Sequence, residues 1–168
     1  MKNILFVASE SVPFIKTGGL ADVVGSLPKN LNKEEYDVRV FIPKYSCMKD
    51  AQKEKLTFKT SFYMDHNYKS IYVGIWEAEV DGIKFYFIDN DHYFSGPKPY
   101  GDDGFFEIEK YSFFSKAVLS SLEFSVITVS IELDAFSPKI PFSFARLIIL
   151  IKLVISVSHA DSFSDSFA

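Results

Sequence analysis

The residues best suited to bind a ligand lie at positions 16–23, where the chain reads Lys-Thr-Gly-Gly-Leu-Ala-Asp-Val. Gly18 and Gly19 have no side chains, so the backbone there can approach a ligand closely and offer its amide hydrogens. Lys16 adds a positive charge beside them. Bare amides next to a cation favour phosphate or another anion.

This segment does not match the common phosphate-binding motifs. In a Walker loop the lysine follows a Gly-x4-Gly spacing, whereas here Lys16 precedes the glycines. The Gly-x-Gly-x-x-Gly pattern of dinucleotide-binding proteins is also absent. From the residues alone two interpretations stay open: an anion-binding loop, or a turn whose glycines merely permit a sharp entry into a helix.

The surrounding pattern predicts a βαβ unit that would position this segment. Residues 3–8 form an apolar run typical of a central parallel strand, and residues 37–42 form a second strand. Between them, residues 19–31 carry apolar side chains at helical spacing, although Pro28 requires the helix to kink or to end early. The segment would then lie at the carboxyl edge of a parallel sheet, where α/β proteins bind ligands.

The following residues predict an antiparallel extension of the same sheet. Strands are expected at 55–63, 71–80 and 83–88, with a tight turn at Asp81-Gly82 between the last two. A loop over 89–104 and a helix over 105–123 complete the pattern. The fold class is therefore α/β, with a Rossmann-like doubly wound sheet.

Composition narrows the choice of partners. The 168 residues carry a net charge of −4, which gives no general attraction to nucleic acid. A single cysteine cannot form a disulfide within the chain, and the three dispersed histidines have no metal-ligand spacing, so neither a disulfide nor a metal site is predicted. No cofactor is expected. The single thiol fits a reducing compartment such as the cytoplasm. The apolar run 147–157 contains Lys152 and is shorter than the roughly 20 residues that span a bilayer, so a membrane segment is not expected.

Three further residues are weaker candidates. His92 could contact a sugar, but a loop histidine is more often exposed to water. Trp76 could stack on a sugar, but aromatic residues in strands are more often packing groups. Cys47 has no evident partner histidine and is interpreted as a passive thiol.

Several motifs of the first 124 residues resemble bacterial glycogen synthases and plant starch synthases. The matching stretches are F-V-A-S-E at 6–10, P-F at 13–14, K-T-G-G-L-A-D-V at 16–23, L-P at 27–28, D-V-R-V-F-I-P-K-Y at 37–45, P-Y-G-D-D at 99–103 and Y-S-F-F-S-K-A-V-L at 111–119. The resemblance implies the amino-terminal half of a GT-B glycosyltransferase, a fold of two Rossmann-like domains with a cleft between them.

The resemblance also implies a retaining transfer of glucose from ADP-glucose to the non-reducing end of an α-1,4-glucan. Lys16 matches the family lysine that contacts the nucleotide sugar, and Gly18 and Gly19 match the glycines that lie against the diphosphate and glucose. Asp22 and Tyr100 match positions near the donor. The alternative is a non-catalytic module that binds a nucleotide or a sugar.

The resemblance ends at about residue 124. Residues 125–168 hold nine serines and no glycine, tyrosine or asparagine, and the family's catalytic histidine, its phosphate-binding Arg and Lys and its second-domain acidic residue have no match. We therefore expect a truncated or frameshifted chain with no catalytic residue and no activity of its own. We also expect an unpaired sheet edge and an aggregation-prone β-branched stretch at 126–133.

Overall fold

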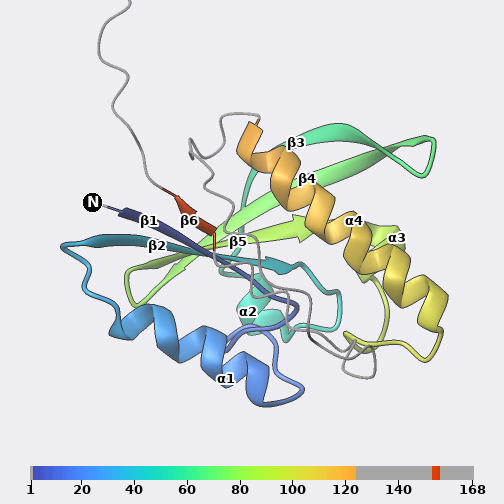
Figure 1. The fold of residues 1–168 in the computed structure, drawn as a ribbon. Helices are drawn as coiled ribbons and strands as arrows, with labels where there is room; N and C mark the ends of the chain where they lie inside the picture. The colour runs from blue at the N-terminus through green and yellow to red at the C-terminus, as the bar shows by residue number, and fades with distance from the viewer. Residues whose placement is uncertain (1, 124–152, 156–168) are drawn as a thin grey trace, which may run out of the picture.

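The computed structural model describes residues 2–123 and 153–155. Its core is one six-stranded sheet in the order β3-β4-β5-β2-β1-β6 (Figure 1). The strands are β1 (Lys2–Val7), β2 (Tyr36–Pro43), β3 (Thr57–His66), β4 (Lys69–Val80), β5 (Ile83–Asp89) and β6 (Leu153–Ile155). The helices are α1 (Gly19–Ser26), the 3₁₀ turn η1 (Leu27–Asn30), α2 (Asp50–Lys53), α3 (Asp91–Phe94) and α4 (Gly104–Glu123).

The sheet combines a parallel centre with an antiparallel side. β1 pairs with β2 and β2 pairs with β5 in parallel, whereas β3, β4 and β5 pair antiparallel. Asp81 and Gly82 form the tight turn between β4 and β5, and both have positive φ (54° and 74°). The α/β class and the antiparallel extension predicted from the sequence are confirmed.

The expectation of an unpaired sheet edge was wrong. On the side of β1 away from β2, β6 pairs with it antiparallel, with Asn3 opposite Ile155 and Leu5 opposite Leu153. The stretch 126–133 and most of the apolar run 147–157 lie outside the described residues. None of the helices that the structure describes is long and apolar enough to cross a bilayer.

The helix expected over 19–31 is shorter than its apolar spacing suggested. α1 ends at Ser26 and the chain continues as η1, whose second residue is Pro28. Proline lacks a backbone N–H, so it fits the first turn of the 3₁₀ segment but would break an α-helix. The single-turn helices α2 and α3 were not predicted, because four residues are too few to show a helical period.

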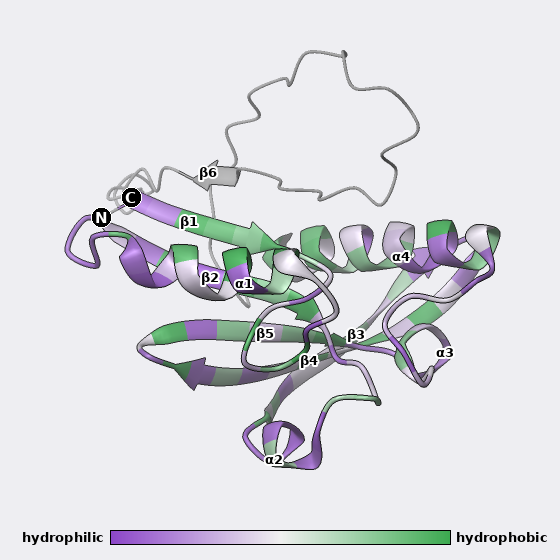
Figure 2. Ribbon diagram, turned by 90° about the horizontal axis from the view of Figure 1, so that it is seen from below, coloured by the Kyte–Doolittle hydropathy of each residue, from purple (hydrophilic) through white to green (hydrophobic). Residues whose placement is uncertain are grey.

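The buried centre of the sheet explains why the chain follows this path. Burial increases along β1, from an exposed Lys2 to a buried Leu5, Phe6 and Val7. Figure 2 shows the same change from hydrophilic to hydrophobic along the strand. Val40, Phe41 and Ile42 of β2 are fully buried, as are Phe85 and Phe87 of β5. The apolar carboxyl ends of these strands fix the position at which the next loop begins.

Candidate functional site

The loop between β1 and α1 is anchored to the sheet by an aromatic side chain. Phe14 is 3% exposed, and its ring packs against Phe85 at 5.0 Å and Phe87 at 4.8 Å between centroids. The backbone N–H of Val12 also donates to the carbonyl of Ala21 at 3.1 Å. The loop is therefore held at both its sheet side and its helix side.

A buried carboxylate shapes the second half of this loop. Glu10 is 2% exposed, and its Oε2 accepts from the Thr17 backbone N–H at 2.5 Å and from Thr17 Oγ1 at 2.7 Å. A buried carboxylate is costly unless such hydrogen bonds satisfy it. This contact fixes Thr17, the residue between Lys16 and Gly18.

Gly18 and Gly19 face open space at the start of α1. Gly18 is extended (φ −153°), and no side chain of the described residues caps the helix. A Cβ on Gly18 would come no closer than 3.8 Å to Glu10 Oε1, and one on Gly19 would meet nothing within 4 Å. Neither glycine has a positive φ. The backbone conformation at these two positions therefore does not require glycine, which disfavours the interpretation that they merely permit a sharp turn.

Gly25, later in α1, shows what a glycine required by packing looks like. A Cβ there would lie 2.2 Å from Val12 Cγ2 and 2.7 Å from the Val12 carbonyl oxygen. That helix–loop contact is possible only without a side chain. Gly18 and Gly19 have no comparable neighbour, which leaves their surroundings free for a ligand.

Lys16 and Asp22 lie together beside the glycines. Lys16 Nζ is 2.7 Å from both oxygens of Asp22, and each side chain is 53% exposed. An ion pair this exposed contributes little to stability, because water and salt screen it. Lys16 can therefore exchange Asp22 for an incoming anion at small cost.

Tyr100 contacts the same loop although it lies 91 residues from Ser9 in the sequence. Its hydroxyl lies 2.6 Å from Ser9 Oγ, the residue before Glu10. Burial raises the pKa of the Tyr100 phenol above its ordinary value, although the hydrogen bond with Ser9 opposes that shift. The neutral hydroxyl therefore persists through the physiological range.

The geometry brings all five sequence-predicted residues to one edge of the sheet. Lys16, Gly18, Gly19 and Asp22 lie at the start of α1, and Tyr100 contacts the loop that carries them. The sequence model of the starch synthase catalytic domain matches residues 3–132. The chain belongs to the starch synthase catalytic domain family.

Curated relatives from this family agree over the same region. Glycogen synthase of Lachnospira eligens is 57% identical over 125 residues, and glycogen synthase of Lachnoclostridium phytofermentans is 57% identical over 122 residues. Each match covers 73% of this chain and 25% of the relative. The chain thus spans about a quarter of the length of these relatives.

A solved structure of the starch synthase family matches the fold. The catalytic domain of starch synthase IV from Arabidopsis thaliana, bound to ADP and acarbose, superimposes with a TM-score of 0.64 at 30% identity. The match covers 72% of this chain and 25% of that structure. It supports the α/β Rossmann-like class predicted from the sequence.

Sequence reasoning missed two residues that shape the site, Ser9 and Glu10. Both lie in the F-V-A-S-E motif, but their partners Tyr100 and Thr17 are visible only in the fold. A charged residue three positions after a buried strand was the available signal for Glu10. Among the described residues, no cluster of three or more His, Cys, Asp or Glu side chains could hold a metal ion.

The weaker candidates have other surroundings. Trp76 is half-buried, donates from Nε1 to Asp89 Oδ2 at 2.9 Å and lies under Lys44, whose Nζ is 4.6 Å from the ring. His92 is exposed on α3 and packs edge-on against Phe106. Burial raises the pKa of the Cys47 thiol. These surroundings favour a packing role for Trp76, a solvent-facing surface position for His92 and an unreactive thiol for Cys47.

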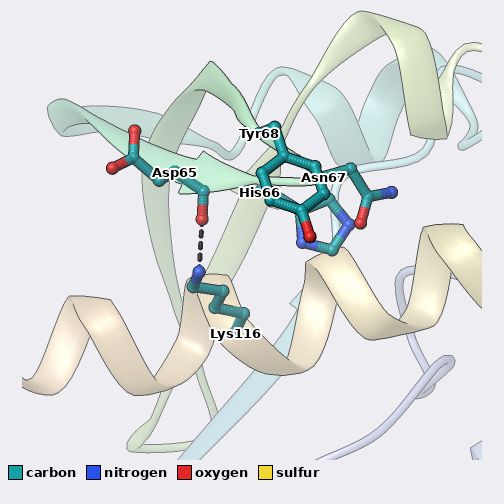
Figure 3. Close-up of a pocket in the computed structure, with 5 residues that line it drawn as sticks. All are labelled: Asp65, His66, Asn67, Tyr68 and Lys116. Carbon is teal, nitrogen blue, oxygen red and sulfur yellow. Dashed lines mark hydrogen bonds between the residues drawn. The ribbon is translucent and has the colours of Figure 1, made fainter.

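A separate cavity of about 510 Å³ lies at the tip of the β3–β4 hairpin, against α4. Figure 3 shows Lys116 extending from α4 to the carbonyl of Asp65, and their hydrogen bond ties the hairpin to the helix. His66 is 6% exposed, and its Nε2 has no hydrogen-bond partner. Asn67 donates to Glu109 at 3.0 Å. The described contacts at this tip brace the hairpin.

Proposed function

We propose that this chain is the donor-loop part of a glycogen synthase. In the intact enzyme, the loop of Lys16, Gly18 and Gly19 contacts the diphosphate and glucose of ADP-glucose. Asp22 and Tyr100 border the same donor site. The enzyme would be a retaining glucosyltransferase of GT-B architecture that extends an α-1,4-glucan at its non-reducing end.

The observation that carries this proposal is the open, uncapped start of α1. The helix dipole places partial positive charge there, and Lys16 adds a full charge at the same point. When the bond between glucose C1 and the diphosphate oxygen breaks, negative charge develops on the departing ADP. Positioned amides and a cation stabilise that charge in the transition state.

The described residues supply one wall of such a site and no catalytic residue. Transfer in a two-domain cleft requires groups from both walls in accurate register, so the chain alone should not transfer glucose. The acceptor glucan would bind in the complete cleft. The single free thiol, Cys47, supports a cytoplasmic location for the protein.

Replacing the lysine tests the donor role directly. In Lys16→Ala, ADP should bind more weakly by about 1.5–3 kcal/mol, the range for a hydrogen bond to a charged group. The titration follows the backbone amide signals of Gly18 and Gly19 by NMR. Lys29→Ala is the matched control, because Lys29 forms a comparable exposed ion pair with Asp81 at 2.6 Å but lies away from the loop. Equal affinity in wild type and Lys16→Ala would remove the assignment.

A chimera separates the enzyme from a non-catalytic binding module. Residues 1–124 should replace the matching quarter of Lachnospira eligens glycogen synthase, at 57% identity, with transfer of glucose from ADP-glucose to glycogen retained. The same chimera carrying Lys16→Ala should lose most of that activity. A folded chimera without activity would favour the binding module, which the similarity to glycogen synthases does not support.

We also propose that the family sequence ends near residue 124 and that residues 125–168 are of different origin. The pairwise matches cover 71–73% of the chain, which supports this proposal, although the family model extends beyond residue 124, to residue 132. Translating the gene after codon 124 in its two other forward frames tests this proposal. A His followed by an Asn-Asp-Trp-like segment in either frame would support it, and family sequence in neither frame would contradict it.

A further inference from the structure

A largely buried ion pair on α4 holds the backbone on both sides of Tyr100. Lys110 is 3% exposed, and its Nζ donates to Glu107 Oε1 at 2.5 Å and to the Pro99 carbonyl at 2.7 Å. The same Glu107 oxygen accepts from the Gly101 backbone N–H at 2.9 Å. One ion pair therefore holds the residue before Tyr100 and the residue after it.

Gly101 leaves room for the Glu107 carboxylate. A Cβ on Gly101 would lie 3.0 Å from Glu107 Oε1, so the carboxylate would have to shift by a few tenths of an ångström. A second residue of α4 contacts the same loop segment. The Tyr111 hydroxyl lies 3.4 Å from the Pro99 carbonyl and 3.0 Å from the Tyr45 hydroxyl. Burial raises the pKa of both phenols, so both stay neutral and can donate.

From Tyr100 the contacts continue to the donor loop. The Tyr100 hydroxyl meets Ser9 Oγ at 2.6 Å, Ser9 precedes the buried Glu10, and Glu10 holds Thr17 by two hydrogen bonds. A continuous path thus joins α4 to the residues next to Gly18.

We propose that Glu107 and Lys110 are positioning residues for the donor loop, acting through Tyr100 and Ser9. This inference rests on the proposed function of that loop. A buried ion pair is a poor source of stability, because desolvation offsets most of the attraction between the charges. What this pair provides instead is a fixed position for Pro99 and Gly101, and through them for Tyr100.

The test uses the full chain and reads the loop before any ligand is added. In Lys110→Met, which replaces the ammonium by an apolar side chain of similar length, the amide NMR signals of Thr17, Gly18 and Gly19 should shift. ADP should then bind about five-fold more weakly, a coupling typical of residues that share one network. In a Tyr100→Phe background, which cuts the path at the Ser9 contact, Lys110→Met should cause no further loss.

Lys98→Met is the matched control. Lys98 pairs with Asp102 at 3.0 Å in the same loop, but both side chains are largely exposed, so neither the signals nor the affinity should change. If Lys110→Met does not fold, Glu107→Gln removes the charge while keeping an oxygen for Gly101, and the same readouts apply. A folded variant with unshifted Gly18 and Gly19 signals overturns the proposal. Unchanged glucose transfer by the chimera carrying Lys16→Ala would refute the proposed function of the loop instead, whereas the signal shifts, which are measured without ligand, would still test the positioning role.

Discussion

The two longest helices that the structure describes both begin at a glycine, but the residues that precede them treat the first backbone amides differently. α1 starts at Gly19 and α4 starts at Gly104, and a Cβ at either position would meet nothing within 4 Å. At α4, Asp103 Oδ1 accepts from the backbone N–H groups of Phe105 at 3.0 Å and Phe106 at 3.3 Å. At α1 the corresponding residue is Gly18, which has no side chain to offer.

The difference separates a helix start built for stability from one left open. The first amides of a helix have no partner within the helix, and a capping side chain is the usual way to satisfy them. α4 uses that solution, whereas α1 keeps its first amides unoccupied by side chains, beside Lys16. The proposed donor site therefore lies at the helix start that gives up a stabilising cap.

Removing the cap of α4 should have the largest effect on stability. In Asp103→Ala the free energy of unfolding should fall by about 1 kcal/mol, the usual cost of losing an N-cap. Urea denaturation followed by circular dichroism measures the change. Asp102→Ala is the control, because Asp102 is exposed and its carboxylate pairs with Lys98. Equal losses in the two variants would show that the Asp103 bonds do not stabilise the helix.

Filling the open space at each helix start should separate stability from binding. Gly19→Ala and Gly104→Ala should each raise the free energy of unfolding by about 0.4–1 kcal/mol, because alanine restricts the unfolded chain more than glycine does. Only Gly19→Ala should weaken ADP binding, since its methyl group occupies space that the proposal assigns to the ligand. If both variants bind ADP as wild type does, the space at Gly19 is not a ligand site.

The sequence predicted the elements whose signals are local. The apolar runs of β1 and β2 and the Asp81-Gly82 turn appear where expected, because burial and positive φ leave a direct mark on residue choice. The end of β3 was placed at 63 instead of His66, because the turn at Asn67 and Tyr68 reaches positive φ without a glycine. Local patterns fail where an unusual residue adopts the required conformation.

The candidate site divides in the same way. Lys16, Gly18 and Gly19 are adjacent in the sequence, so their shared position was predictable. Ser9 and Tyr100 are 91 residues apart, and no periodicity announces their contact. The role of Glu10 was hidden for a different reason, because a carboxylate after a strand normally faces water. Only the fold shows that Glu10 is buried and accepts hydrogen bonds from Thr17.

An aspartate at position 18 would give α1 the same kind of cap that Asp103 gives α4. In Gly18→Asp the free energy of unfolding should rise by only a few tenths of a kcal/mol, since glycine is itself a tolerable N-cap. ADP binding should nevertheless be lost, because the new carboxylate accepts from the first amides of α1 and repels the diphosphate. Stability is measured in urea, and binding from the amide signal of Gly19.

Gly18→Asn separates the two causes of that loss. Asparagine caps a helix about as well as aspartate but carries no charge. If occupation of the amides matters most, Gly18→Asn should lose nearly as much ADP affinity as Gly18→Asp; if repulsion matters most, it should bind nearly as wild type does and Gly18→Asp should regain affinity in high salt. Wild-type ADP affinity in Gly18→Asp at low salt would show that the open start of α1 does not hold the diphosphate.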